Sequence, residues 1–269
     1  MRRKRPAKPP KVPKASKSRP ALNDPWPALR QFTAARIGLP RSGASLATAP
    51  LLELRLAHAR ARDAVHERFD AAHLAGELAT LGLPVLALAS AAEDRQHYLM
   101  RPDLGRRLGE SSSAALAPHA GEYDVAFIIA DGLSARAVAA HARPVLAQLL
   151  PRLRGNNWRT APLSVVRHGR VAIGDAIAMA LRASIAVVLI GERPGLSSPD
   201  SMGAYLTWQP TLHITDADRN CISNIRPEGL GYTDAAFKLA HLLTAMRARR
   251  LSGVALKDDG DRLLFDERG

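Results

Sequence analysis

The sequence predicts an α/β fold: a Rossmann-like, mostly parallel sheet flanked by helices and preceded by an N-terminal helical segment. Short continuous runs of Val, Ile and Leu, such as 124–130 and 185–190, are typical of strands buried on both faces of a parallel sheet. Segments with helical periodicity separate these runs, which favours right-handed crossovers. Aromatic residues make up only 4% of the chain, so we expect an aliphatic core.

The elements follow from local patterns along the chain. From Leu51 to Phe69 the apolar positions step by three or four, which predicts an amphipathic helix with His58 on its apolar stripe. A second helix is expected over 71–81, because Gly82 and Pro84 form a stop signal. The remaining expected elements are strand 84–89, helix 101–116, strand 124–130, helix 134–153, strand 162–167, helix 173–182, strand 185–190, strands 204–208 and 213–215, and helix 233–250. We expect Ser134 and Thr233 to cap their helices, with Asp234 in the first turn of the last one.

Composition divides the chain into four parts. Residues 1–25 combine Lys and Arg with Pro and have almost nothing apolar to bury, so we expect a disordered basic tail. Residues 26–100 are expected to form the N-terminal helical segment and 101–256 the Rossmann-like domain. Residues 257–269 are charged and are expected to be frayed.

The net charge of +13 is concentrated at the start of the chain. Residues 1–20 carry nine Lys or Arg and no acid, and subtracting these nine leaves +4 for the rest. Such a segment is either a solubilising tail or an electrostatic tether to nucleic acid or another acidic partner. No apolar run reaches the roughly 18 residues of a membrane span, and no apolar segment follows the basic start. We therefore expect a cytoplasmic protein with no membrane partner.

Candidate functional residues lie in three loops that follow buried strands: 131–134, 168–170 and 191–195. If the strands are parallel, all three loops emerge at one edge of the sheet, where α/β proteins bind ligands. An exposed Glu192–Arg193 pair would contribute only about 0–1 kcal/mol, so we interpret Glu192 as a functional residue. The first loop is either an ordinary helix-capping turn or a site for a polar group at a helix N-terminus.

His168 and Cys221 each have two interpretations. His168 is either a surface histidine or a general base that needs a partner in reach. Cys221, the single cysteine, excludes an intrachain disulfide and is either a small buried apolar residue or part of a site. Dinucleotide, P-loop, hydrolase-elbow and paired metal-ligand motifs are missing, so the residues support no phosphate site or hydrolase nucleophile of these kinds and we expect no metal ligand.

Several longer sequence motifs occur in order between Trp26 and Ser252. They include residues 34–43, 58–65, 101–107 and 130–134, followed by Arg167-His168-Gly169-Arg170-Val171, Gly191-Glu192-Arg193-Pro194-Gly195-Leu196 and Cys221-Ile222-Ser223-Asn224-Ile225. Together, and in this order, these motifs resemble those of the small (light) subunit of ethanolamine ammonia-lyase.

That resemblance implies an adenosylcobalamin-dependent carbon–nitrogen lyase, which converts ethanolamine to acetaldehyde and ammonia. The chain would bind cobalamin at an interface with a large catalytic subunit and be active only with it, so 101–256 would be the cobalamin-binding domain. Cofactor contacts in the family match Val171, Glu192 and Cys221. The chain lacks Asp-x-His-x-x-Gly, so a bound cobalamin should keep its own lower base. The family also suggests a bacterial microcompartment, but residues 1–20 lack an apolar face and their prolines prevent a helix.

Two other functions are compatible with parts of the sequence. A non-enzymatic nucleic-acid-binding protein could use the basic tail, but no recognition helix or aromatic platform is evident, so we expect no specific nucleic-acid partner. A free-standing α/β enzyme, such as a hydrolase using His168, would lack a recognisable nucleophile.

Overall fold

The computed structural model describes residues 26–257, in two compact units that divide between Pro50 and Leu51. The first unit contains helix α1 (Trp26–Arg30) and a hairpin of β1 (Arg41–Ser42) and β2 (Ser45–Leu46). The predicted basic tail and all but the first residue of the predicted frayed end lie outside the described residues.

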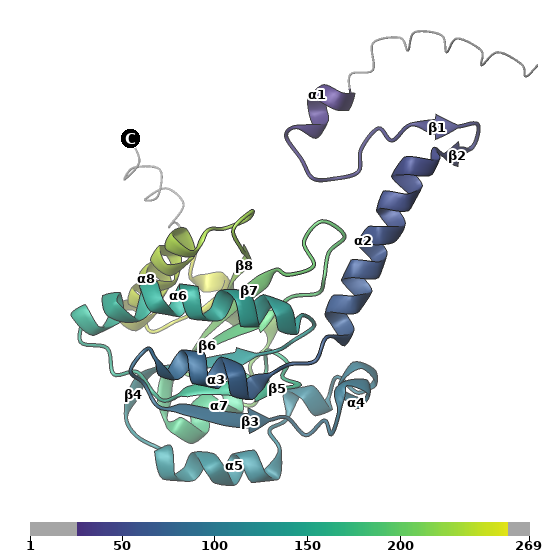
Figure 1. The fold of residues 1–269 in the computed structure, drawn as a ribbon. Helices are drawn as coiled ribbons and strands as arrows, with labels where there is room; N and C mark the ends of the chain where they lie inside the picture. The colour runs from purple at the N-terminus through teal and green to yellow at the C-terminus, as the bar shows by residue number, and fades with distance from the viewer. Residues whose placement is uncertain (1–25, 258–269) are drawn as a thin grey trace, which may run out of the picture. The chain divides into compact units, whose positions relative to one another are not determined.

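A six-stranded sheet forms the centre of the second unit, in the order β3-β5-β4-β6-β7-β8 (Figure 1). Its strands are β3 (Val85–Ala89), β4 (Tyr123–Ala130), β5 (Leu163–Arg167), β6 (Ala183–Gly191), β7 (Met202–Trp208) and β8 (Arg219–Ile225). The first four strands in the sheet order are mutually parallel, whereas β7 is antiparallel to both β6 and β8. The predicted mostly parallel α/β fold is therefore confirmed.

Helices cover both faces of this sheet (Figure 1). Along the chain, the helices after α1 are α2 (Thr48–His66), α3 (Ala71–Ala79), α4 (Arg95–Met100), α5 (Glu110–Leu116), α6 (Ala135–Gly155), α7 (Ile173–Leu181) and α8 (Tyr232–Arg249), and the 3-10 turns are η1 (Leu104–Arg106), η2 (Ala117–His119), η3 (Asp216–Asp218) and η4 (Gly253–Ala255). Residues of α3, α6 and α8 pack on one face, and residues of α5 and α7 pack on the other.

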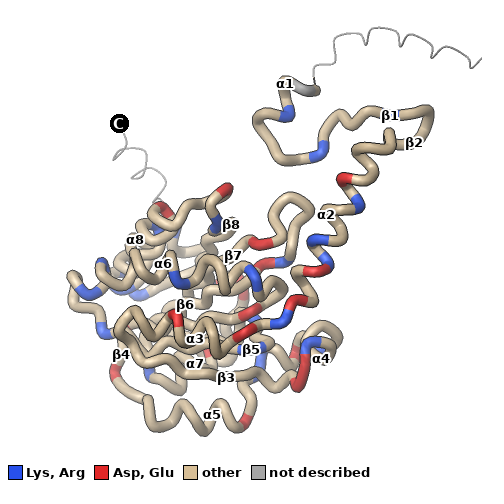
Figure 2. The backbone as a smooth tube through the Cα atoms, viewed as in Figure 1, with Lys and Arg blue, Asp and Glu red and all other residues tan. Residues whose placement is uncertain are grey.

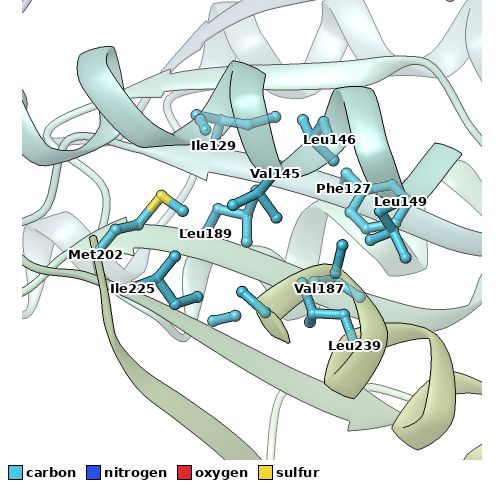
Figure 3. Packing of buried hydrophobic residues seen from close by; sticks show 14 of the residues in the cluster. Phe127, Ile129, Val145, Leu146, Leu149, Val187, Leu189, Met202, Ile225 and Leu239 are labelled. Carbon is cyan, nitrogen blue, oxygen red and sulfur yellow. The ribbon is translucent and has the colours of Figure 1, made fainter. Parts of the chain in front are cut away.

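The two central strands bury side chains on both faces. Phe127 and Val187 pack with residues of α6, such as Leu146, and with residues of α8 (Figure 3). Ile128 and Val188 belong to the core on the opposite face. Successive residues of a strand point to opposite faces. This double burial explains why the strands appear in the sequence as uninterrupted apolar runs.

The single helix expected over 101–116 is wrong. This range instead contains η1 and α5. Helix α4 ends just before it, at Met100, and the Asp94 side chain caps α4 by accepting a hydrogen bond from the His97 N–H. After η1, the Gly109 N–H donates to the Ala89 carbonyl (3.0 Å) and Leu108 forms a bridge with Ser90. These contacts tie the chain to the end of β3 and interrupt the helical periodicity.

Two further expectations near the C-terminus are also wrong. Residues 213–215 form no strand, because Thr215 instead caps η3 through a reciprocal pair of hydrogen bonds with Asp218. The strand in this region is β8, which the sequence analysis missed because its exposed polar positions resemble those of a loop. Gly231, not Thr233, occupies the N-cap of α8, although Asp234 lies in the first turn as expected.

The boundary proposed at residue 100 remains a prediction. The compact unit begins at Leu51, and its sheet already includes β3, which precedes that boundary. The helix expected from Leu51 is confirmed as α2, along which acidic and basic residues are interleaved (Figure 2). Within residues 26–257, no helix combines the length and apolar character needed to cross a membrane.

Candidate functional site

The carboxyl ends of three parallel strands meet at one edge of the sheet. Ala130 at the end of β4 is paired with Val166 of β5 on one side and with Ile190 of β6 on the other. Helix α6 follows β4 on one face, and α7 follows β5 on the opposite face. Neighbouring strands whose helices lie on opposite faces mark a topological switch point, where α/β sheets open a crevice. The expectation that the three loops emerge together is confirmed.

The first and third loops are in direct backbone contact. The Leu133 N–H donates a hydrogen bond to the Gly191 carbonyl (2.9 Å), and Gly132 has a left-handed φ of 55°. A Cβ at Gly132 would overlap the Gly191 carbonyl, and a Cβ at Gly191 would overlap the Ser134 carbonyl. Both positions therefore require glycine to keep the loops this close.

Asp131 joins the first loop to the second. Its side chain is buried, and its carboxylate accepts hydrogen bonds from the Gly169 N–H (3.1 Å) and the Arg95 guanidinium (3.3 Å). Ser134, the last residue of this loop, caps α6 as expected by accepting from the Ala137 N–H. The loop therefore forms an ordinary helix-capping turn, and the interpretation of it as a site for a polar group stays a prediction.

Tyr98 lies beneath the second loop and was missed by the sequence analysis. It is fully buried, and its hydroxyl donates to the Gly169 carbonyl (3.1 Å). The guanidinium carbons of Arg95 and Arg170 lie 4.9 and 4.4 Å from its ring centroid, within cation–π range. Burial raises the pKa of the Tyr98 phenol, which keeps it neutral. Asp94, as a helix cap, was the signal that could have revealed α4 and hence Tyr98.

A pocket of about 380 Å³ lies between the three loops. Two of the predicted cofactor-binding residues, Val171 and Glu192, line it. The other lining residues are Tyr98, Gly132, Leu133, Arg170, Ile190, Gly191, Arg193 and Tyr205. We call this cavity the edge pocket.

Glu192 is held in place by donors from other elements. Its carboxylate accepts hydrogen bonds from the Ser201 hydroxyl and from the Asn224 N–H (3.4 Å). Its own N–H donates to the Ser201 carbonyl (2.9 Å). Among the ion pairs of residues 26–257, none joins Glu192 to Arg193, so the alternative of a simple local pair is wrong.

Cys221 lies on β8 opposite Tyr205 of β7, which lines the edge pocket. It is exposed, so the interpretation as a small buried apolar residue is wrong. Desolvation by its neighbours and the Glu192 carboxylate raise the pKa of the thiol, whereas a hydrogen bond with Tyr205 lowers it. The thiol is therefore neutral near pH 7. The structure brings Cys221 next to the pocket that Val171 and Glu192 line.

His168 is oriented towards the interior of the loop cluster. Its φ is 57°, its Nδ1 lies 3.5 Å from an Asp131 carboxylate oxygen, and its ring centroid is 5.9 Å from that of Tyr98. Its side chain is only 19% exposed, so it is not an ordinary surface histidine. Both neighbours also hold the Gly169 backbone, which supports a structural role in this loop. Within the described part of the chain, no group of three or more His, Cys, Asp or Glu is arranged to hold a metal ion.

The fold and the position of the pocket define a class of protein. It is an α/β protein with a mostly parallel sheet and a crevice at the switch point of that sheet. The crevice combines one oriented carboxylate, backbone groups and apolar side chains.

Comparison with known proteins identifies the family. The family model described as ethanolamine ammonia-lyase light chain (EutC) matches residues 23–257. The ethanolamine ammonia-lyase small subunit of Azotobacter vinelandii is 53% identical over 254 residues, covering 93% of this chain and 94% of that protein. The small subunit of Ralstonia nicotianae is 52% identical over 247 residues, which cover 90% of this chain and 92% of that protein. The small subunit of Xanthomonas campestris pv. campestris is 53% identical over 246 residues, which cover 90% of this chain and 90% of that protein. The chain belongs to the ethanolamine ammonia-lyase light chain family.

Proposed function

We propose that this chain holds adenosylcobalamin against the large catalytic subunit of an ethanolamine ammonia-lyase, and that Val171, Glu192 and Cys221 contact the cofactor. The relatives are named small subunits, which supports a larger partner. The observation that carries the proposal is that Val171 and Glu192 line one pocket at the sheet edge, with Cys221 paired to Tyr205 beside it.

The residues of the edge pocket fit the chemistry of a corrin ring, which is broad, apolar and fringed with amides. Val171, Leu133 and Ile190 offer apolar surface, and the Glu192 carboxylate can accept hydrogen bonds from amide N–H groups. The Arg170 Nε is buried without a hydrogen-bond partner, which leaves a donor for an amide oxygen. This combination suits a neutral, amide-bearing ligand better than a simple ion.

The division of labour follows from this fit. When bound here, adenosylcobalamin would supply the radical chemistry, and the residues of this chain would hold it. The chain's own residues bind and orient the ring: Glu192 is fixed by Ser201 and Asn224, and Val171 excludes water from one side. We propose a cytoplasmic enzyme complex. Entry into a microcompartment would depend on residues 1–20, which lie outside the described part of the chain.

Co-purification tests the proposal. The chain is purified alone and with its large subunit, each is incubated with adenosylcobalamin in the dark, and retained corrinoid absorbance is measured after gel filtration. We expect retention and conversion of ethanolamine to acetaldehyde only with both subunits. Full cofactor retention and turnover by the chain alone would contradict the shared site.

Two variants locate the contact within the complex. Val171→Trp fills the edge pocket and should abolish corrinoid retention, whereas Val254→Trp, at a position 84% exposed, should not. Glu192→Gln keeps the shape but weakens acceptance from amides, and should reduce affinity by about tenfold. Thermal unfolding of each complex separates loss of binding from loss of folding. Unchanged affinity in both folded site variants would refute the assignment.

A further inference from the structure

The segment between β6 and β7 carries Glu192 at one end and Ser201 at the other. It spans 192–201 and contains no helix or strand. Its two ends are joined, because the Glu192 N–H donates to the Ser201 carbonyl (2.9 Å) and the Ser201 hydroxyl donates to the Glu192 carboxylate. The position of this carboxylate therefore depends on where Ser201 is held. We call this segment the β6–β7 loop.

The residues that precede Ser201 are anchored to helix α6. The hydroxyl of Ser134, the N-cap of α6, donates to the Pro199 carbonyl (2.9 Å). About two turns further along the helix, the His141 Nε2 lies 3.0 Å from the Asp200 carbonyl oxygen. A carbonyl oxygen only accepts hydrogen bonds, so the His141 Nε2 carries the hydrogen and donates it. Two consecutive carbonyls just before Ser201 are thus held by α6.

His141 is fixed on its other side by helix α8. Its side chain is buried, and burial lowers its pKa, so the ring is neutral near pH 7. With the hydrogen on Nε2, the Nδ1 of the neutral ring accepts from the Tyr232 hydroxyl (2.9 Å). The charged groups nearest the ring are Asp200, its ion-pair partner Arg226 (3.5 Å), and Glu228. His141 therefore offers one defined donor to the β6–β7 loop.

The Glu192 carboxylate has little room to move while the loop is held in this way. A Cβ at Gly203 of β7 would lie only 2.8 Å from the Glu192 Oε1, so the carboxylate lies directly against the strand backbone. Apart from the Ser201 hydroxyl, its donor is the Asn224 N–H, at the longer distance of 3.4 Å. A shift of Ser201 would therefore leave the carboxylate with its weaker hydrogen bond only.

We propose that His141 is a positioning residue for the cofactor site. Its hydrogen bond to the Asp200 carbonyl fixes Ser201, and Ser201 fixes the Glu192 carboxylate at the edge pocket. His141 is not among the residues that line this pocket, so it acts through the β6–β7 loop and not by contact with the cofactor. The inference rests on the proposed function for the role of Glu192 and adds the residue that sets its position.

The affinity for adenosylcobalamin tests this role in the complex of the chain with its large subunit. His141→Asn places an amide near the position of Nδ1 but is too short to reach the Asp200 carbonyl. We expect the dissociation constant, measured by equilibrium dialysis in the dark, to rise about fivefold. His141→Gln places its N–H near the position of Nε2, and should restore the affinity to within about twofold of wild type. Ser201→Ala breaks the next link of the path and should reproduce the loss.

A double variant tests whether the effect passes through Glu192. Residues that act along one hydrogen-bonded path have effects that do not add. The affinity of His141→Asn/Glu192→Gln should therefore equal that of Glu192→Gln alone. A role of His141 that concerned only the packing of α6 against α8 would instead give losses that multiply.

The Cys221 thiol reports the position of Glu192 without any cofactor. The Glu192 carboxylate raises the pKa of this thiol. In the full chain, Glu192→Gln should therefore move the inflection of the iodoacetamide reaction rate to lower pH. His141→Asn should move it in the same direction by a smaller amount, because the released carboxylate spends less time near Cys221. The double variant should match Glu192→Gln.

Ser112→Ala is the matched control. Like His141→Asn, it removes a hydrogen bond between a buried helical side chain and the backbone, here the bond that the Ser112 Oγ accepts from the Ala89 N–H (2.9 Å). Ser112 belongs to α5, on the opposite face of the sheet from α6. We expect this variant to leave the affinity and the thiol inflection unchanged, even where thermal unfolding shows a lower melting temperature.

The outcomes separate this inference from the proposed function. Wild-type affinity and a wild-type thiol inflection in folded His141→Asn would overturn the inference, as would losses that multiply with those of Glu192→Gln. Either result leaves corrin binding at the edge pocket intact. If Glu192→Gln itself binds the cofactor as wild type does, the proposed contact fails, and the thiol inflection alone decides whether His141 positions Glu192.

Discussion

Cys221 shows how a single residue acquires its chemistry from neighbours that are distant in the sequence. Tyr205 faces it across the β7–β8 pair, and the Glu192 carboxylate contributes a repulsive negative charge. Desolvation and this charge favour the neutral thiol over the thiolate. Because the thiolate is the reactive form, Cys221 is suited to packing against a ligand rather than to attacking one.

The alkylation rate of Cys221 should therefore depend on folding. Since the folded-state pKa is raised, the thiolate fraction at pH 8 is smaller in the folded chain than in the chain unfolded in urea. Iodoacetamide should react more slowly with the folded chain, and the inflection of rate against pH should lie higher. Because Cys221 is the only cysteine of the chain, no other thiol contributes to the rate, and no variant that lacks other cysteines is needed.

Tyr205→Phe serves as the internal test of the cause. It removes the hydrogen bond that lowers the pKa of the thiol, so the inflection should move to still higher pH. A folded-state inflection at or below that of the unfolded chain would contradict this description of the site.

At the scale of elements, a buried ion pair connects α7 to β8. The Arg219 guanidinium donates to both Asp175 carboxylate oxygens (2.8 and 2.6 Å) and to the Thr207 hydroxyl of β7 (2.8 Å). Arg219 is 8% exposed and Asp175 3%. Removing one partner of such a pair leaves the other buried without compensation, which costs more than the intact pair contributes.

Arg219→Met should lower the free energy of unfolding by about 3–5 kcal/mol, because it leaves the Asp175 carboxylate buried without a cationic partner. The double variant Asp175→Leu/Arg219→Met should recover most of this loss. Urea unfolding followed by circular dichroism measures both.

A matched control is the exposed pair of Arg159 with Glu122 (3.2 Å), where Arg159→Met should cost less than about 1 kcal/mol. Equal losses at Arg219 and Arg159 would show that burial of the Arg219 pair has no energetic consequence.

At the scale of the whole molecule, charge is distributed unevenly along the chain. Nine of the basic residues lie in the first 20 positions, whereas the described part carries both signs in mixture (Figure 2). A run of like charges attracts a polyanion without reading its sequence, and salt weakens that attraction.

We expect the full chain to bind duplex DNA weakly, independently of sequence and only at low salt. Deletion of residues 1–20 should abolish this binding and leave the circular dichroism signal of the α/β unit unchanged. Fluorescence anisotropy at several salt concentrations measures the effect. Tight, sequence-selective binding by the deleted form would instead favour a nucleic-acid-binding protein.

The sequence by itself determined the fold class and most of its elements. The signals are apolar runs, the spacing of apolar residues from Leu51 and the Ser134 cap. Each involves only a few neighbouring residues, so it can be recognised without knowledge of the fold. Parallel strands then bring the three loops to one edge by topology alone. Glu192 was singled out by its loop after a buried strand as well as by resemblance to a family. The assignment of Val171 and Cys221 as cofactor contacts came from the resemblance alone, because no local chemistry distinguishes Val171 from any other valine.

Only the tertiary structure decided how those residues are surrounded. The Tyr98 hydroxyl meets a carbonyl 71 positions away, and the Glu192 carboxylate is held by β8 rather than by the adjacent Arg193. The helix expected over 101–116 was broken by contacts with the end of β3. Hydrogen bonds and close packing between distant segments depend on how the whole chain folds, and a local pattern carries no information about them.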